Sequence, residues 1–223
     1  MKIAVFGGSF NPLHIGHATV AETLVKEYGY DKVLFVPTFI APHKEIAGCI
    51  SAEHRLEMIK AFCAADGNGA FEAEDCEIKR GGVSYTCDTL EYLKTKFEKV
   101  LDGKFALVMG EEIASEFYKW KNPDKIASLA DFIIFPRAEV VTARAENLSD
   151  EKIKNIPSNS YEGDFKKKFT LEEFGYPCKI ADFPEIPVSS TEIRFRAAAG
   201  NSFRYLVPVS VFEYIEREKL YIN

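Results

Sequence analysis

The chain has 223 residues, 47% hydrophobic and 28% charged, an ordinary balance for a globular protein of a length that allows one full core. Its formal net charge of −6 argues against non-specific nucleic-acid binding, which needs a basic surface. The five cysteines show no Cys-x-x-Cys spacing, so we expect neither a zinc site nor a disulfide framework. There is no export signal and no apolar run of membrane-spanning length, so we expect a cytoplasmic protein without membrane contacts.

The first predicted element is a short buried strand at residues 3–6, which the pair Gly7-Gly8 ends. Asn11-Pro12 indicates a turn, and beyond Gly16 the apolar residues recur at helical spacing. We therefore predict a strand, a tight glycine loop and the start of a helix.

This arrangement is suited to binding a phosphate group. The first N–H groups of a helix have no partner inside the helix, and the helix dipole adds partial positive charge there. A ligand can approach the backbone closely at Gly7 and Gly8, which lack Cβ atoms. His14 and His17 share a face of the helix start and can donate hydrogen bonds. The alternative, that these histidines merely cap or solvate the helix, is weaker because so many such features share one turn.

A second buried strand at residues 32–36 completes a strand–helix–strand unit, which predicts a parallel sheet. The loop at 38–50 then carries Pro42-His43-Lys44. In parallel sheets, ligands bind at the carboxyl ends of strands, so His43 and Lys44 are candidate phosphate donors. A solvent-exposed loop tripeptide is the alternative.

Strands and helices continue to alternate along the chain. We predict a helix from Ser51, on which Arg55 faces outward or toward the loop. Further elements are expected in this order: a strand at 71–80, a helix from about Cys87 with Thr86 as a plausible cap, a strand at 105–109, a helix from Glu111 to about Tyr118, a short helix starting at Asn122-Pro123, and a strand at 132–135.

The alternation lapses in residues 138–177, which are mostly polar and hold one possible helix at about 149–156. We interpret this stretch as an excursion from a single domain that spans residues 1–223. A strand at 178–183, a helix from Ser189 or Ser190 to about Ala199 and a last helix at about 209–218 follow. The predicted fold class is α/β, a Rossmann-like doubly wound parallel sheet with C-terminal helices.

Residues 188–194 again place small hydroxyl groups at a helix start. Arg194 follows about one turn later, where its guanidinium group can bind a phosphate with two hydrogen bonds. An ordinary capped helix with a surface arginine is the alternative. Both stretches together nevertheless indicate two phosphate-binding helix starts.

Residues 7–17, GGSFNPLHIGH, resemble the G-G-[ST]-F-[DN]-P-x-H-x-G-H signature of the nucleotidyltransferase α/β-phosphodiesterase superfamily. Residues 189–194, SSTEIR, resemble its second signature, [ST]-S-[ST]-x-[IL]-R. Over residues 1–137 and 178–223 the chain is similar to bacterial nicotinate-nucleotide adenylyltransferases, through Pro42-His43-Lys44, Ser84-Tyr85-Thr86 with Thr89-Leu90, Gly110 and Trp120. In NAD biosynthesis that family converts nicotinate mononucleotide and ATP to deamido-NAD and pyrophosphate, with Mg²⁺.

The resemblance implies a set of site residues. The implied catalytic groups are His14, His17, Lys44 and Arg194. The implied ATP-binding residues are Gly7, Gly8, Ser9, Phe10, Gly16, Gly110, Glu112, Ser189 and Ser190. The implied nicotinate-nucleotide-binding residues are Asn11, His43, Thr86, Trp120 and Lys121, and no residue is assigned as a metal ligand.

Two positions depart from the family pattern. The family commonly has Gly-x-Asp where this chain has Gly110-Glu111-Glu112, so the side chain at the position that would contact the adenosine ribose is one methylene longer. The family's Trp-Tyr is Trp120-Lys121 here, a change that is tolerable if the backbone N–H of residue 121 binds the pyridine carboxylate; the lysine could also favour the acid over the amide.

Three other functions stay open at this point: a sister adenylyltransferase acting on nicotinamide mononucleotide or phosphopantetheine, a non-catalytic nucleotide sensor, and a fragment of an adenylate-forming ligase. The expected partners are ATP and nicotinate mononucleotide. A homo-oligomer is left open by the sequence.

Overall fold

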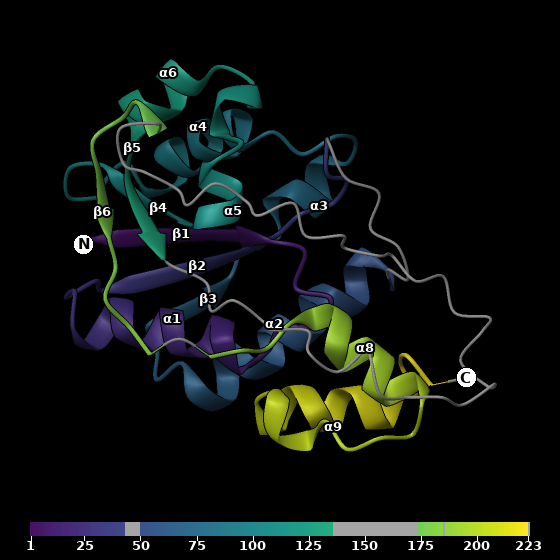
Figure 1. The fold of residues 1–223 in the computed structure, drawn as a ribbon. Coiled ribbons are helices and arrows are strands. Elements are labelled where there is room, and N and C mark those ends of the chain that lie inside the picture. Colours follow the sequence, from purple (N-terminus) through teal and green to yellow (C-terminus); the bar gives the residue numbers. More distant parts are fainter. Residues whose placement is uncertain (43–49, 136–173, 185, 223) are drawn as a thin grey trace.

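A computed structural model describes residues 1–42, 50–135, 174–184 and 186–222. The described strands form one parallel sheet in the order β3-β2-β1-β4-β5-β6 (Figure 1). Their bounds are β1 Ile3–Gly8, β2 Lys32–Pro37, β3 Phe71–Ala73, β4 Phe105–Gly110, β5 Ala130–Phe135 and β6 Cys178–Ile180.

Helices cover both faces of this sheet (Figure 1). One face carries α1 Ile15–Lys26, α2 Ala52–Asp66, α8 Ser190–Ala198 and α9 Val209–Glu218, with the short 3₁₀ helix η3 Arg204–Leu206. The other carries α3 Cys76–Arg80, α4 Thr86–Phe97, α5 Glu111–Ala114 and α6 Pro123–Leu129, with the 3₁₀ helix η1 Phe117–Lys119. Among the described residues, no helix has the length and apolar character to cross a membrane.

Successive residues of the central strands point into two separate cores. In β1, Ala4 and Phe6 join the core beneath α1 and α2, whereas Ile3 and Val5 join the core beneath α4 and α6. Strands covered on both faces need apolar residues at every position, which explains the continuous apolar runs in the sequence.

The strand order reverses between β1 and β4. In doubly wound sheets the loops after two such strands diverge, and ligands bind in the crevice between them. The order itself is the Rossmann order, so the predicted fold class is confirmed.

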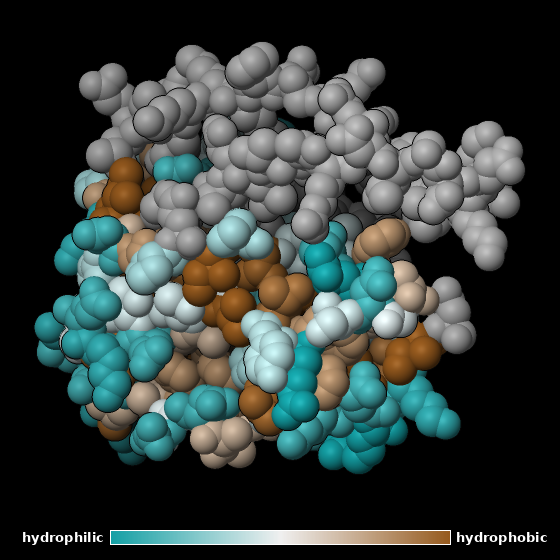
Figure 2. Space-filling view, turned by 60° about the horizontal axis from the view of Figure 1, so that its bottom comes forward, coloured by the Kyte–Doolittle hydropathy of each residue, from teal (hydrophilic) through white to brown (hydrophobic). Residues whose placement is uncertain are grey.

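Figure 2 turns toward the viewer the side that carries α1, α2, α8 and α9. Apolar side chains gather near the middle of this face and hydrophilic ones lie around them. Nothing in the described contacts shows a partner for this area, and exposed apolar atoms are common on protein surfaces.

Two element predictions were wrong. The strand expected at 71–80 ends at Ala73, and the last residues of that range form the helix α3 instead. The cause is Glu74, which is 1% exposed: its carboxylate accepts a hydrogen bond from the Cys76 N–H and another from Lys96 Nζ, so the chain turns there. The helix expected from Glu111 to Tyr118 is instead split into α5 and η1.

Smaller differences concern the ends of elements. The late strand stops at Ile180 rather than Phe183, and α4 begins at Thr86 with Tyr85 in the capping position, although Thr86 was the expected cap. The excursion at 138–177 lies mostly outside the described residues, and the possible helix at 149–156 lies entirely outside them. The single-domain organisation of the whole chain therefore stays a prediction.

Candidate active site

The loop between β1 and α1 lies at the sheet's switch point, and it has the strand–loop–helix arrangement that its sequence predicts. His14 is the N-cap residue of α1, so the loop ends at the open N-terminus of a helix. A Cβ atom added at Gly7 would meet no described atom within 4 Å. As far as the described residues extend, the backbone at Gly7 borders open space.

The two histidines of this loop lie against each other. Their ring centroids are 3.7 Å apart with the planes at 27°. The His14 backbone N–H donates to Nδ1 of His17 over 3.2 Å. An imidazole that accepts at Nδ1 carries its proton on Nε2 when neutral. His17 is thereby set to donate a hydrogen bond from Nε2.

Close packing determines where these rings lie. A Cβ atom at Gly16 would be 3.1 Å from two ring atoms of His14 and 3.3 Å from a Val188 methyl group, so glycine is needed for this approach. Phe10, which is 1% exposed, packs edge-on against His17 with ring centroids 5.0 Å apart. The histidines are therefore held by their neighbours before any ligand binds.

The second predicted phosphate motif contacts the first directly. Ser190 Oγ donates to the Pro12 carbonyl over 2.8 Å, and Arg194 Nη1 donates to the Asn11 carbonyl over 2.8 Å. Ser189 caps α8 by accepting the Glu192 N–H over 3.1 Å. Two motifs more than 170 positions apart therefore form one site. In this state, Arg194 and Ser190 bind main-chain carbonyl groups of the loop.

Two further side chains hold the same loop and were missed in the sequence. Arg55 was expected to face outward or toward the loop after β2, but it is 1% exposed and donates from Nη1 to the Ser9 carbonyl over 2.8 Å. A signal was present, because Arg55 precedes the buried Met58, Ile59 and Phe62 by three, four and seven positions. Tyr221 donates to Asn11 Oδ1 over 2.8 Å, and no sequence pattern indicates that contact.

Hydrogen bonds also connect the segment that follows β2 with the segment that precedes α4. Ser84 Oγ accepts the Phe39 N–H over 3.1 Å, and the Ser84 N–H donates to the Ile40 carbonyl over 2.9 Å. The stretch before Thr86 therefore lies beside the loop that leads to His43 and Lys44, which themselves lie outside the described residues.

The residues predicted to bind the pyridine ring lie near α4 and η1. Thr86 is the first residue of α4 and is partly exposed. Trp120 follows η1 and packs on Phe117, with ring centroids 5.2 Å apart. Gly110 ends β4, and a Cβ atom there would come within 3.3 Å of the Phe135 ring.

Lys121 is engaged with neighbouring side chains. Its Nζ lies 3.2 Å from both carboxylate oxygens of Asp88 and 4.5 Å from the centroid of the Tyr85 ring. Its charge is therefore already balanced within the protein. Glu112 is exposed on α5.

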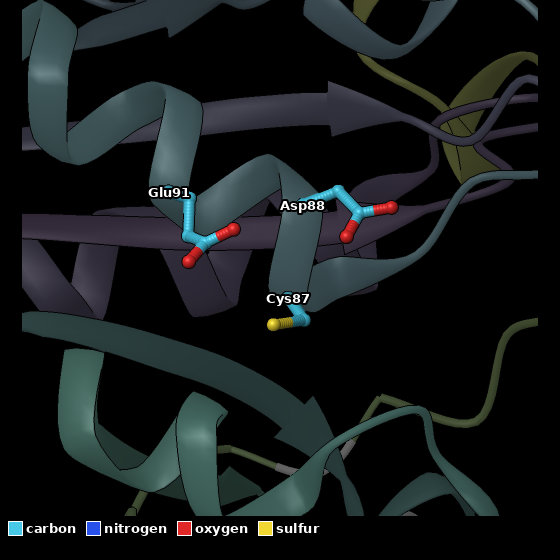
Figure 3. A group of neighbouring side chains, drawn as sticks. All are labelled: Cys87, Asp88 and Glu91. Atoms are coloured by element: carbon cyan, nitrogen blue, oxygen red, sulfur yellow. The ribbon is translucent and has the colours of Figure 1, made fainter.

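Three potential metal ligands cluster on α4 (Figure 3): Cys87, Asp88 and Glu91, whose ligand atoms lie within 4.8 Å of one another. Asp88 pairs with Lys121 at 3.2 Å and Glu91 pairs with Lys125 at 2.9 Å. Burial, and then the charges of Glu91 and Asp88, raise the pKa of the Cys87 thiol, which disfavours the thiolate. Two of the three groups are therefore engaged in ion pairs, Asp88 with Lys121 before α6 and Glu91 with Lys125 on α6.

Known proteins share this combination of fold and motifs. The sequence profile of the Cytidylyltransferase-like family matches residues 5–196. The chain is therefore a nucleotidyltransferase of the cytidylyltransferase-like class.

Relatives of similar sequence identify the family within this class. A protein of Treponema pallidum, named a probable nicotinate-nucleotide adenylyltransferase, is 38% identical over 99% of each chain. A protein of the same name from Salinibacter ruber is 34% identical over 99% of this chain and 98% of its own. The chain belongs to the nicotinate-nucleotide adenylyltransferases, and the predicted family is confirmed.

A solved structure shares the fold. The nicotinic acid mononucleotide adenylyltransferase of Plasmodium falciparum, in complex with NaAD, superimposes with a TM-score of 0.68 at 19% identity. The match covers 99% of this chain and 97% of that one.

Proposed function

We propose that this protein transfers the adenylyl group of ATP to nicotinate mononucleotide, giving deamido-NAD and pyrophosphate in NAD biosynthesis. The observation that carries the proposal is the contact between the two phosphate motifs, in which Arg194 and Ser190 of α8 bind the carbonyl groups of Asn11 and Pro12. This contact supports one pocket for a polyphosphate rather than two separate anion sites.

The reaction needs no covalent enzyme intermediate. A phosphate oxygen of the mononucleotide attacks the α-phosphorus of ATP, forming the new P–O bond. The bond between that phosphorus and the bridging oxygen to the β-phosphate breaks, and pyrophosphate leaves with the electron pair. Such phosphoryl chemistry depends mainly on positioning and on stabilising the negative charge that develops.

Each group at the site has a role in the proposed reaction. His17 donates from Nε2 to the α-phosphate, and His14, stacked on it, binds the ATP phosphates. Arg194, with Ser189 and Ser190, holds the departing phosphates, and Lys44 balances the charge of the phosphates. The loop at Gly7, Gly8, Ser9, Phe10 and Gly16, with Gly110 and Glu112 across the switch point, seats ATP.

Asn11, His43, Thr86, Trp120 and Lys121 seat the nicotinate nucleotide, Trp120 by stacking on the ring. The backbone N–H of residue 121 is the better candidate for the pyridine carboxylate, because the Lys121 ammonium already pairs with Asp88.

The divalent cation of the reaction is Mg²⁺ in this proposal. Mg²⁺ is commonly held by substrate phosphates and water rather than by a cage of protein ligands. The donors of the loop are imidazole, hydroxyl and N–H groups, which suit phosphate oxygens, so the cation enters with ATP. When bound, it neutralises phosphate charge.

A two-substrate assay of pyrophosphate release with Mg²⁺ tests the proposal. We expect turnover with ATP and nicotinate mononucleotide, and a lower kcat/KM with nicotinamide mononucleotide. A preference for the amide would make the protein a sister adenylyltransferase. ATP binding without pyrophosphate release from any mononucleotide would make it a sensor.

A further inference from the structure

Arg55 is a buried cation beneath the phosphate-binding loop. It lies on α2, is 1% exposed, and is among the largest fully buried side chains of the described residues. Its Nη1 donates to the Ser9 carbonyl over 2.8 Å. Its Nε is also buried and has no hydrogen-bond partner.

Within the part of the chain that the structure describes, the charge of Arg55 has no close acidic partner. None of the ion pairs formed by the described residues includes it. Glu53, two residues earlier on α2, is fully exposed; hydrogen bonds at the helix start lower its pKa more than the Arg55 charge does. Buried charges in proteins are usually paired, because an unpaired charge loses its hydration without compensation.

The position of this charge suggests what compensates it. The carbonyl group that Arg55 holds belongs to Ser9, between the backbone that borders open space at Gly7 and the loop carbonyl groups held by α8. A triphosphate bound on that loop brings several negative charges to the same end of the sheet. Charges inside a protein interact more strongly than charges in water.

We propose that Arg55 is a positioning residue for ATP: it fixes the Ser9 carbonyl and supplies a buried positive charge that the bound triphosphate neutralises. This inference rests on the proposed function, since it requires ATP on this loop. In this proposal the unpaired charge of Arg55 destabilises the ligand-free protein, and ATP binding removes that destabilisation.

Three substitutions separate the charge from the hydrogen bond. Arg55→Met removes both, Arg55→Gln keeps a donor without charge, and Arg55→Lys keeps the charge. We would measure the affinity for Mg·ATP by calorimetry without mononucleotide, and the melting temperature of the ligand-free protein. We expect Arg55→Met and Arg55→Gln to weaken ATP binding by on the order of tenfold or more, and Arg55→Lys to retain most of it.

The melting temperature distinguishes this role from a structural one. Removal of an unpaired buried charge leaves the ligand-free protein as stable as before or more stable, so the melting temperature of Arg55→Met should not fall. Lys60→Met is the matched control, since Lys60 lies on the same helix, pairs with Glu57 at 2.8 Å and is exposed. It should leave ATP affinity unchanged.

Two results would overturn the inference. One is an Arg55→Met protein that melts earlier but binds ATP as tightly as the wild type. The other is an Arg55→Gln protein with wild-type affinity, because the hydrogen bond to Ser9 would then suffice. If the wild-type protein itself bound no ATP, the proposed function would fail first, and this inference with it.

Discussion

The hydroxyl group of Tyr221 donates a 2.8 Å hydrogen bond to the side-chain oxygen of Asn11, across 210 positions of sequence. Asn11 is 1% exposed and lies in the loop between β1 and α1. The chain reverses after α9 through Lys219 at φ 52° and Tyr221 at φ 63°, left-handed conformations that are uncommon outside glycine. With its oxygen accepting from Tyr221, the amide group of Asn11 presents its N–H₂ side elsewhere. The last residues of the chain therefore orient a residue predicted to bind the nicotinate nucleotide.

Replacing Tyr221 by phenylalanine tests this arrangement. The variant keeps the ring and loses the hydrogen bond, so we expect a loss of about 1 kcal/mol in the free energy of unfolding. Loss of this restraint on the Asn11 side chain should also raise KM for nicotinate mononucleotide several-fold more than KM for ATP. Denaturant titration and steady-state kinetics measure the two effects. Tyr205→Phe is the control because Tyr205 is 81% exposed. Unchanged kinetics in Tyr221→Phe would contradict the assigned role of Asn11.

Two glycines of the loop provide a second test. Gly7→Ala adds a methyl group where no described atom lies within 4 Å, and Gly7 is not among the residues with positive φ. The free energy of unfolding should stay the same or rise by up to about 1 kcal/mol. The methyl group would nevertheless occupy space needed by a phosphate, so KM for ATP should rise by at least about tenfold.

Gly16→Ala should behave differently. Its methyl group would lie 3.1 Å from the His14 ring, so the ring must move and stability should fall together with kcat. Thermal unfolding and pyrophosphate-release assays on both variants separate the two cases. Normal ATP kinetics in Gly7→Ala would show that the phosphate does not approach the backbone there.

His17 is the group for which we expect the largest loss of activity. His17→Ala removes the Nε2 donor, and loss of one such donor typically lowers kcat by about 10²–10³-fold. The circular dichroism spectrum should stay native. His54→Ala serves as the control histidine, since His54 lies on α2 and contacts the Tyr214 hydroxyl at 3.0 Å. Near-normal pyrophosphate release from His17→Ala would remove His17 from the mechanism.

The sequence predicts the parts of this protein that depend on local pattern. Continuous apolar runs mark the buried strands, and the glycine and serine motifs mark the two helix starts. The sequence also indicates that these two helix starts lie in one site, because both signatures belong to one family. The sequence pattern does not predict the short α3. This helix forms where the buried Glu74 turns the chain by accepting hydrogen bonds from Cys76 and Lys96.

The side chains that hold the loop between β1 and α1 were the hardest features to predict from the sequence. Arg55 lies on the apolar face of α2, as its spacing from Met58, Ile59 and Phe62 indicates. Charged residues are rarely fully buried, so we expected Arg55 to face outward or toward the loop after β2. Tyr221 reaches Asn11 only because the whole chain folds back on itself. Contacts between distant residues of this kind depend on tertiary packing and leave no local pattern.

Two thiols, the half-buried Cys63 and the buried Cys76, make the stability of the protein sensitive to alkaline pH. Burial, with a smaller effect of Glu72, raises the pKa of Cys63 to about 12. Burial, followed by the charges of Glu74 and Glu77, raises the pKa of Cys76 to about 12. A raised pKa in the folded state means that its stabilising effect is complete below the ordinary thiol pKa and is lost as pH rises toward the folded value. Stability should therefore fall between about pH 9 and 12.

Alkylation offers a direct check on these thiols. Because the thiolate is the reactive form, iodoacetamide at about pH 8 should leave Cys63 and Cys76 unmodified in the native protein and label both after denaturation. Mass spectrometry of the peptides identifies the labelled sites. Rapid labelling of either thiol in the native state would contradict its raised pKa.

The choice between the acid and amide nucleotides should not depend on the Lys121 side chain. Its ammonium group lies 3.2 Å from both oxygens of Asp88 and above the Tyr85 ring, so little of its charge is left for a substrate carboxylate. In Lys121→Met, we expect the ratio of kcat/KM for nicotinate over nicotinamide mononucleotide to change by less than about threefold, or about 0.65 kcal/mol. Asp88→Asn releases the ammonium group and should increase the ratio. A collapse of the preference in Lys121→Met would assign the selectivity to the side chain, and the backbone N–H of residue 121 would lose that role.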